Sequence, residues 1–264
     1  MPTFTSKNVS IHYNFNDAAG PDAPVLMFSN SLGTTLDMWR PQLEALSSDF
    51  RILRYDTRGH GQSSAPQGPY SLDQLGEDVI ALLDHLQLPK VHLCGLSLGG
   101  FVTQWLAINA PERLHSAVIC NIAAVTAAPT FWHDRANLVL SEGMQAIVDG
   151  VMARFFSPRF AQGSPAAVRA VHEGFVSTPA VGYAGACAAI QHADFRANLP
   201  TVDLPVLVIG GSLDQAAPPE GVKQVAELIP NARYVELDAA HISNIENPAG
   251  FNGAIVDFLG GLKA

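Results

Sequence analysis

Ser97 stands between glycines at the end of a short apolar run, in the stretch VHLCGLSLGG of residues 91–100. Gly95, Ser97 and Gly99 match the pattern G-x-S-x-G, and the helix-like stretch GGFVTQWLAINA begins within it. A turn of this kind between a strand and a helix holds the serine in a strained backbone conformation, requires small flanking residues and projects the hydroxyl above the sheet. The context favours a nucleophilic Ser97 over a plain Gly-rich turn.

A serine hydroxyl is a weak nucleophile at neutral pH and needs a base, which an acid must orient. In a strand-turn-helix architecture the base is a histidine that follows both the serine and the acid in the chain. Five histidines follow Ser97: His115, His133, His172, His192 and His241. His115 begins a strand-like run and therefore lies at the edge of the sheet opposite to that of Ser97. The next three histidines fall in a segment without clear strands. His241 follows the strand-like run ARYVELD of residues 232–238 and is the predicted base.

Asp214 is the predicted acid because its loop, GSLDQAAPP, follows the strand-like run LPVLVIGG and therefore lies at the carboxyl edge of the sheet. Asp203 precedes the same run and belongs to the opposite edge. Asp238 remains a rival because it ends the next run, but it is close to His241 in the chain and a structural role is expected for it.

Stabilising the negative charge that develops on a carbonyl oxygen requires two backbone N–H groups. One belongs to the residue after the nucleophile, Leu98, and the other to the loop SNSLGTTLDMW, which follows the strand-like run PVLMFSN.

Six apolar runs rich in β-branched residues alternate with helix-period segments, which predicts a mostly parallel sheet with helices on both faces. The runs are residues 24–30, 50–56, 90–95, 114–121, 204–211 and 232–238. Ser71 and Gln74 form a capping-box pattern before a predicted helix that extends to Leu86, and residues 4–15 resemble an antiparallel hairpin. From residue 125 to residue 200 no clear strand appears, and apolar residues from Met144 to Phe155 recur at helical spacing. This segment predicts a helical insertion over the carboxyl edge of the sheet.

The chain has 264 residues and a net charge of −9, from 15 Lys+Arg against 24 Asp+Glu, so a phosphate backbone would be repelled. Nucleic acid is therefore not expected as a partner. We also expect no signal peptide, no membrane span and a cytoplasmic location. Three widely spaced cysteines, Cys94, Cys120 and Cys187, are predicted to be buried small residues rather than redox or metal sites.

The segments SNSLGTTLDMW, YDTRGHGQSS, HLCGLSLGG, GSLDQAAPP and AAHISNIENP together resemble the α/β-hydrolase superfamily, and specifically the bacterial 3-oxoadipate enol-lactonases. This resemblance implies an α/β-hydrolase fold in which residues 1–124 and 201–264 form the core and 125–200 a helical cap subdomain. It assigns Ser97, Asp214 and His241 to the catalytic triad and Leu32 and Leu98 to the oxyanion hole.

Two further features of the resemblance concern the loops beside the site. Asn30-Ser31 stand where many members of the superfamily have His-Gly before the first oxyanion residue. The family's D-x-R-G-x-G-x-S turn, in which Asp56, Arg58, Gly59 and Gly61 take part, is interpreted as structural support at the rim of the site.

The function implied is hydrolysis of a small carboxylated lactone in bacterial aromatic catabolism, through an acyl-enzyme and without metal or organic cofactor. A broad carboxylesterase or a C–C bond hydrolase would use the same triad, and a ligand receptor could retain the triad with negligible turnover.

A carboxylated substrate needs a cation in an apolar pocket, because an unpaired buried carboxylate is costly. Five arginines of the insertion could supply it: Arg135, Arg154, Arg159, Arg169 and Arg196. We favour Arg135, which follows a strand's carboxyl edge closely and has Trp132 beside it as an apolar wall.

Overall fold

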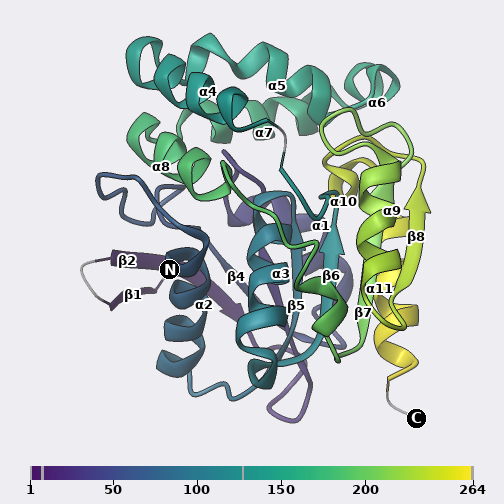
Figure 1. The fold of residues 1–264 in the computed structure, drawn as a ribbon. Helices are drawn as coiled ribbons and strands as arrows, with labels where there is room; N and C mark the ends of the chain where they lie inside the picture. The colour runs from purple at the N-terminus through teal and green to yellow at the C-terminus, as the bar shows by residue number, and fades with distance from the viewer. Residues whose placement is uncertain (1, 7–8, 127, 263–264) are drawn as a thin grey trace.

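The computed structural model describes residues 2–6, 9–126 and 128–262, and every structural statement below refers to these residues. Eight strands form one sheet in the order β1-β2-β4-β3-β5-β6-β7-β8 (Figure 1). The strands are β1 (Thr3–Ser6), β2 (Val9–Asn16), β3 (Val25–Ser29), β4 (Arg51–Tyr55), β5 (Val91–Leu96), β6 (Leu114–Cys120), β7 (Val206–Gly211) and β8 (Arg233–Leu237). Strands β3 to β8 pair in parallel.

The six apolar runs of the sequence form these six parallel strands, and each strand end lies within two residues of the predicted one. β3 and β7 are buried along their whole length, as expected for strands that helices cover on both faces. The predicted mostly parallel sheet with helices around it is therefore confirmed.

The predicted N-terminal hairpin is present, since β1 pairs with β2 in antiparallel orientation and β2 continues the sheet against β4. Residues 7–8, within the predicted hairpin, lie outside the described residues. So do residue 127 of the predicted cap and residues 1, 263 and 264 of the predicted core.

Helices surround the sheet: α1 (Arg40–Leu46), α2 (Leu72–His85), α3 (Leu98–Asn109), α9 (Pro219–Leu228), α10 (Ser243–Glu246) and α11 (Pro248–Gly260). In Figure 1, α2 and α3 lie in front of the strands and α1 lies behind them. The predicted capping box begins α2, where Ser71 Oγ accepts from the Gln74 amide and the Gln74 side chain accepts from the Ser71 amide. No helix among the described residues is long and apolar enough to cross a bilayer.

Five α-helices occupy the described part of the insertion between β6 and β7: α4 (Pro129–Glu142), α5 (Val148–Phe155), α6 (Pro158–Gly163), α7 (Pro165–Val176) and α8 (Ala180–Ile190). They form the upper layer in Figure 1, over one end of the sheet. The apolar stripe from Met144 to Phe155 is not one helix, because a short 3₁₀ turn at Met144–Ala146 precedes α5. The division into core and cap subdomain remains a prediction.

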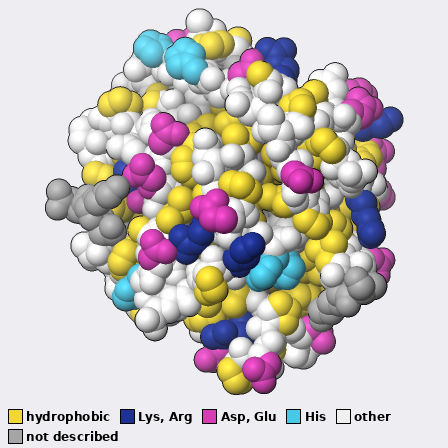
Figure 2. Space-filling model, turned by 60° about the horizontal axis from the view of Figure 1, so that its bottom comes forward, with side chains coloured by type: hydrophobic (Ala, Val, Ile, Leu, Met, Phe, Trp, Pro, Cys, Tyr) yellow, Lys and Arg dark blue, Asp and Glu magenta, His cyan; other side chains and the backbone are white. Residues whose placement is uncertain are grey.

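On the face of the molecule shown in Figure 2, Lys and Arg side chains lie beside Asp and Glu side chains rather than gathering into a basic patch. Together with the net charge of −9, this surface offers little that would hold a nucleic acid backbone on that face.

Candidate active site

Ser97 occupies the sharp turn between β5 and α3, with φ 58° and ψ −113°. This left-handed conformation is unusual for a residue with a Cβ atom. A Cβ atom at Gly95 would overlap the carbonyl oxygen of Gly99, and one at Gly99 would overlap the carbonyl oxygen of Ser29. The two glycines are therefore required by close backbone contacts, and the turn has the strained geometry that its sequence predicts.

Asp214 and His241 form a buried pair at the carboxyl edge of the sheet. His241 Nδ1 lies 2.8 Å from Asp214 Oδ2, and their side chains are 5% and 0% exposed. The backbone amides of Ala216 and Ala217 donate to Asp214 Oδ1 at 2.8 and 2.9 Å. Asn121 Nδ2 donates to Oδ2 at 3.0 Å, so both carboxylate oxygens have two partners.

This environment keeps Asp214 ionised. Burial alone would raise the pKa of its carboxyl group, but the neighbouring His241 and the hydrogen bonds from Ala217 and Asn121 outweigh it and lower the pKa. An ionised Asp214 accepts a hydrogen bond from the N–H at His241 Nδ1, which leaves Nε2 without a proton in the neutral ring.

Asp238, the rival acid, lies on the surface. Its side chain is 64% exposed and forms an ion pair with Arg159 at 2.9 Å. The geometry therefore supports Asp214 as the partner of His241.

The loop after β3 approaches the N-terminus of α3, because the Gly99 amide donates to the Asn30 carbonyl at 2.9 Å. This contact holds the loop that carries Leu32 beside the turn that carries Leu98, the two predicted oxyanion residues. Neither of their amides has a hydrogen-bond acceptor within the described part of the chain. Two free N–H groups beside a serine are what an oxyanion hole requires.

Residues of the D-x-R-G-x-G-x-S turn support the loop after β3 through hydrogen bonds to its backbone amides. Asp56 Oδ1 accepts from the Leu36 amide at 2.8 Å, and His60 Nε2 accepts from the Gly33 amide at 3.0 Å. Burial lowers the pKa of His60, so the ring is neutral and can accept at Nε2 while Nδ1 donates to the Arg58 carbonyl. The supporting role expected for this turn agrees with these contacts.

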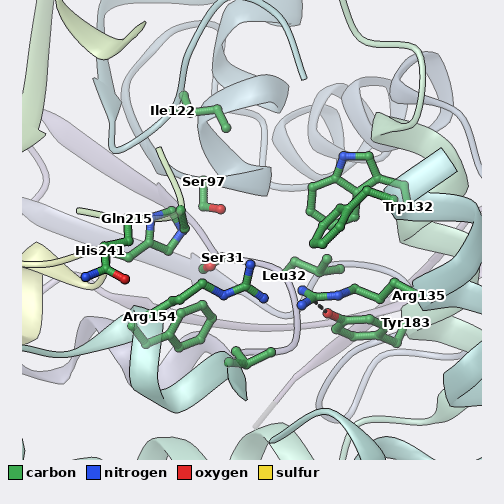
Figure 3. Close-up of a pocket in the computed structure, with 14 residues that line it drawn as sticks. Ser31, Leu32, Ser97, Ile122, Trp132, Arg135, Arg154, Tyr183, Gln215 and His241 are labelled. Atoms are coloured by element: carbon green, nitrogen blue, oxygen red, sulfur yellow. Dashed lines mark hydrogen bonds between the residues drawn. The ribbon is translucent and has the colours of Figure 1, made fainter. Parts of the chain in front are cut away.

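A cavity of about 240 Å³ opens beside Ser97 (Figure 3). Its lining consists of Ser31, Leu32, Ser97, Ile122, Phe131, Trp132, Arg135, Val151, Arg154, Phe155, Tyr183, Gln215, Ala216 and His241. Ser97 and His241 face the same space, but no hydrogen bond joins them among the described residues. Catalytic hydrogen bonds are often long without substrate and shorten when it binds.

Two guanidinium groups enter this cavity from the insertion. Arg135 of α4 donates to the Tyr183 hydroxyl at 3.4 Å and lies 4.7 Å from the centre of the Phe131 ring. Arg154 of α5 lies 5.7 Å from the same ring, and burial together with the charge of Arg135 lowers its pKa. None of the residues that line the cavity is Asp or Glu. The cavity therefore carries positive charge that an anionic ligand could neutralise.

Trp132, predicted as an apolar wall, also lines the cavity, and its indole N–H donates to Thr126 at 2.6 Å. Of the other arginines, Arg159 pairs with Asp238 and Arg196 with Asp194, both at the surface. Arg169 is exposed on α7 and does not line the cavity.

Three residues of the site were given no role of their own from the sequence: Ser31, His60 and Asn121. Arg154 was one of the five candidate arginines, although Arg135 was favoured over it. Asn121 has φ 50° at the end of β6, a conformation that asparagine tolerates, and its side chain bridges Asp214 and Ser243. His60 stands inside the quoted YDTRGHGQSS motif, so its place between two glycines was the available signal.

The three cysteines are free and buried, as predicted, and burial raises the pKa of Cys187 to about 12. Within the described residues, no group of three or more His, Cys, Asp or Glu side chains is arranged to hold a metal ion.

Residues 24–174 and 176–248 match the α/β-hydrolase fold family, and the chain belongs to this family. It is similar to 3-oxoadipate enol-lactonase 2 of Acinetobacter baylyi, with 42% identity over 96% of this chain and 94% of the relative. Enol-lactonase 1 of the same organism is 38% identical over 93% and 90% of the two chains. The crystal structure of the enol-lactonase from Burkholderia xenovorans superposes with a TM-score of 0.96 at 43% identity, covering 98% of this chain and 100% of that one.

These similarities confirm the predicted resemblance to enol-lactonases and the prediction that the chain is an enzyme that hydrolyses esters. The assignment of individual residues to catalytic roles rests on the geometry described above and remains a proposal.

Proposed function

We propose that this protein hydrolyses 3-oxoadipate enol-lactone to 3-oxoadipate, with Ser97 as nucleophile, His241 as base and Asp214 as the acid that orients it. The observation that carries the proposal is the position of Ser97 and the buried Asp214–His241 pair at one cavity that also holds two guanidinium groups. The enol-lactonase relatives support the choice of substrate.

In the first step Ser97 Oγ bonds to the lactone carbonyl carbon and its proton passes to His241 Nε2. The carbonyl π electrons move to the oxygen, where the amides of Leu32 and Leu98 stabilise the negative charge. Asp214 stabilises the imidazolium that forms, without taking its proton.

The bond between the carbonyl carbon and the ring oxygen then breaks, and the imidazolium returns a proton to the departing oxygen. The leaving group is an enol that remains attached to the acyl chain and could close the ring again. Its tautomerisation to a ketone removes that nucleophile and makes the step effectively irreversible. Water activated by His241 then cleaves the acyl-enzyme and releases the diacid.

The substrate's carboxylate is assigned to Arg135, with Arg154 as a second cation beside it. Both guanidinium groups face the cavity, the described residues that line it include no Asp or Glu, and the hydrogen bond from Arg135 to Tyr183 is long at 3.4 Å. A carboxylate would therefore gain charge-assisted hydrogen bonds, and the only bond of Arg135 to a described residue that it could displace is the long one to Tyr183. Trp132 and Phe131 form the apolar surface beside it.

A hydrolysis screen tests the reaction class. The purified protein is given the carboxylated enol-lactone, a neutral aryl ester and a vinylogous diketone in parallel, and we expect the lactone to have the highest kcat/KM. A preference for the aryl ester or the diketone would show a carboxylesterase or a C–C bond hydrolase instead. A single-turnover burst without steady-state hydrolysis would show a ligand receptor.

The role of Arg135 is tested separately. Arg135→Met should lower kcat/KM for the carboxylated lactone by about 10- to 100-fold, the loss expected for one charge-assisted contact. Hydrolysis of the neutral aryl ester should stay nearly unchanged. Arg169→Met is the matched control, because Arg169 is exposed and outside the cavity. Equal losses on both substrates would indicate a structural role for Arg135.

A further inference from the structure

Ser31 carries a hydroxyl that the triad and the oxyanion amides leave unused. The residue is 1% exposed, and its Oγ is buried without a hydrogen-bond partner among the described residues. Buried hydroxyl groups in proteins are normally hydrogen-bonded, so an exception indicates a partner that binds there. Ser31 lines the same cavity as Ser97 and His241, which shows where such a partner would be (Figure 3).

The backbone of Ser31 is held firmly. Its amide donates to Met38 Sδ at 3.3 Å, and its carbonyl accepts from the amide and the hydroxyl of Thr34 at 3.2 and 2.8 Å. The position of the Ser31 side chain is therefore fixed by the loop, and only the rotation of its Cα–Cβ and Cβ–Oγ bonds remains free. A donor on a fixed backbone needs little reorganisation during a reaction.

Covalent geometry relates this hydroxyl to the oxyanion hole. Ser31 Oγ is four bonds from the amide nitrogen of Leu32, so the two atoms lie within about 5 Å of one another in any rotamer. An oxygen that accepts from the Leu32 amide therefore lies within about 8 Å of Ser31 Oγ, and rotation of the Ser31 side chain can shorten that distance. The other hydroxyl of this segment, on Ser29, cannot serve in this way because it is already bonded to the Tyr55 hydroxyl at 2.8 Å.

We propose that the Ser31 hydroxyl is a third oxyanion donor, which hydrogen-bonds to the carbonyl oxygen of the substrate as that oxygen becomes negative. This inference rests on the proposed ester hydrolysis but not on the particular lactone. When Ser97 Oγ bonds to the carbonyl carbon and the π electrons move to oxygen, that oxygen can accept from Leu32, Leu98 and Ser31. No proton leaves Ser31 in this step.

The stabilisation should be greater in the transition state than in the bound substrate, because the oxygen carries more charge there. Ser31→Ala is therefore expected to lower kcat by about 10- to 100-fold with KM nearly unchanged, somewhat less than the loss of a backbone oxyanion donor. The same factor should apply to the enol-lactone and to a neutral aryl ester, since both form the same oxyanion.

A second variant separates hydrogen bonding from packing. Ser31→Cys keeps a side chain of similar size but offers only a weak S–H donor, so it should be nearly as slow as Ser31→Ala. Ser29→Ala is the matched control, since it removes a hydroxyl from the same segment that does not line the cavity. We expect Ser29→Ala to change thermal stability more than kcat.

The decisive measurement uses an aryl trifluoromethyl ketone, whose carbonyl carbon bonds to a nucleophilic serine and whose oxygen becomes anionic. Ser31→Ala should weaken its inhibition by about the same factor as kcat. Binding of the dicarboxylate product, measured by calorimetry, should not change. Full activity of Ser31→Ala or Ser31→Cys would overturn the proposal, as would an equal loss of product binding.

Failure of the proposed function would be recognised differently. If the wild-type protein does not hydrolyse the enol-lactone but does hydrolyse the aryl ester, the lactone assignment is wrong while the role of Ser31 is still measured on the ester. If the wild-type protein neither turns over an ester nor binds the ketone, both proposals are wrong.

Discussion

Asp214→Asn removes the negative charge of the proposed acid and keeps the shape of its side chain. In the native protein Oδ1 accepts from the amides of Ala216 and Ala217, while Oδ2 accepts from His241 and Asn121. The single oxygen of an asparagine side chain can serve only one of these pairs. Because the two backbone amides cannot turn away, we expect the asparagine oxygen to stay with them and its NH₂ group to face His241.

An NH₂ group in that position requires an acceptor at His241 Nδ1, and so selects the tautomer whose proton is on Nε2. That tautomer cannot take the proton of Ser97. We therefore expect kcat to fall by about 10³- to 10⁴-fold with KM nearly unchanged. The free energy of unfolding should fall by about 1–3 kcal/mol, because a buried hydrogen bond to a charged group is lost.

The assay is steady-state hydrolysis of the enol-lactone and of an aryl ester, together with urea unfolding of the same samples. Asp238→Asn is the matched control, since Asp238 is exposed and paired with Arg159 at the surface, where ion pairs contribute only about 0–1 kcal/mol. A severe loss of kcat in Asp238→Asn and a mild one in Asp214→Asn would refute the reasoning, because the acid would then be Asp238.

Two further predictions concern the nucleophile and the loop that supports the oxyanion hole. Ser97→Ala should remain folded and lose about 10⁵-fold or more in kcat, and a variant that kept a tenth of wild-type kcat would show that Ser97 is not the nucleophile. His60 has a pKa lowered by burial, so the unfolded chain binds its proton first as the pH falls. Stability is then fully present above about pH 6.5 and is lost between that value and the lowered pKa of His60, by up to about 1.4 kcal/mol per pH unit. In urea unfolding from pH 8 to 5, the free energy of unfolding should fall less in His60→Gln than in the wild-type protein. An identical pH dependence of that free energy in the two proteins would contradict a neutral His60.

The positions of Ser97, Asp214 and His241, the proposed triad, could be predicted from the sequence because each of them stands in a local pattern tied to the end of a strand. Gly95 and Gly99 around Ser97 reflect backbone contacts that exclude any side chain, and such a requirement is visible in one short stretch. Chain order and strand ends then left few choices for Asp214 and His241. Because parallel strands bring their carboxyl ends to one edge of the sheet, the position of each residue at the end of its own strand was enough to predict that the three lie together.

The supporting residues could not be found in the same way. Asn121 reaches Asp214 across 93 positions of the chain, and nothing near it in the sequence shows which carboxylate it meets. Ser31 was noted only as a departure from the family pattern, because whether its hydroxyl has a partner depends on contacts with other parts of the fold. In the sequence, Arg154 resembles any solvent-exposed arginine on a helix. Only the position of α5 beside the cavity distinguishes it from Arg169.

The positive cavity has to be reconciled with a chain whose net charge is −9. At physiological ionic strength charges more than about 8 Å apart are largely screened in solvent, so the acidic surface has little effect on an anion that has entered the site. Inside, Arg135 and Arg154 are close enough for the charge of the first to lower the pKa of the second, and no Asp or Glu is found among the described residues that line the cavity. Their mutual repulsion is relieved when an anion binds between them. The surface charge and the cavity charge thus act over different distances, and an acidic protein can select an anionic substrate.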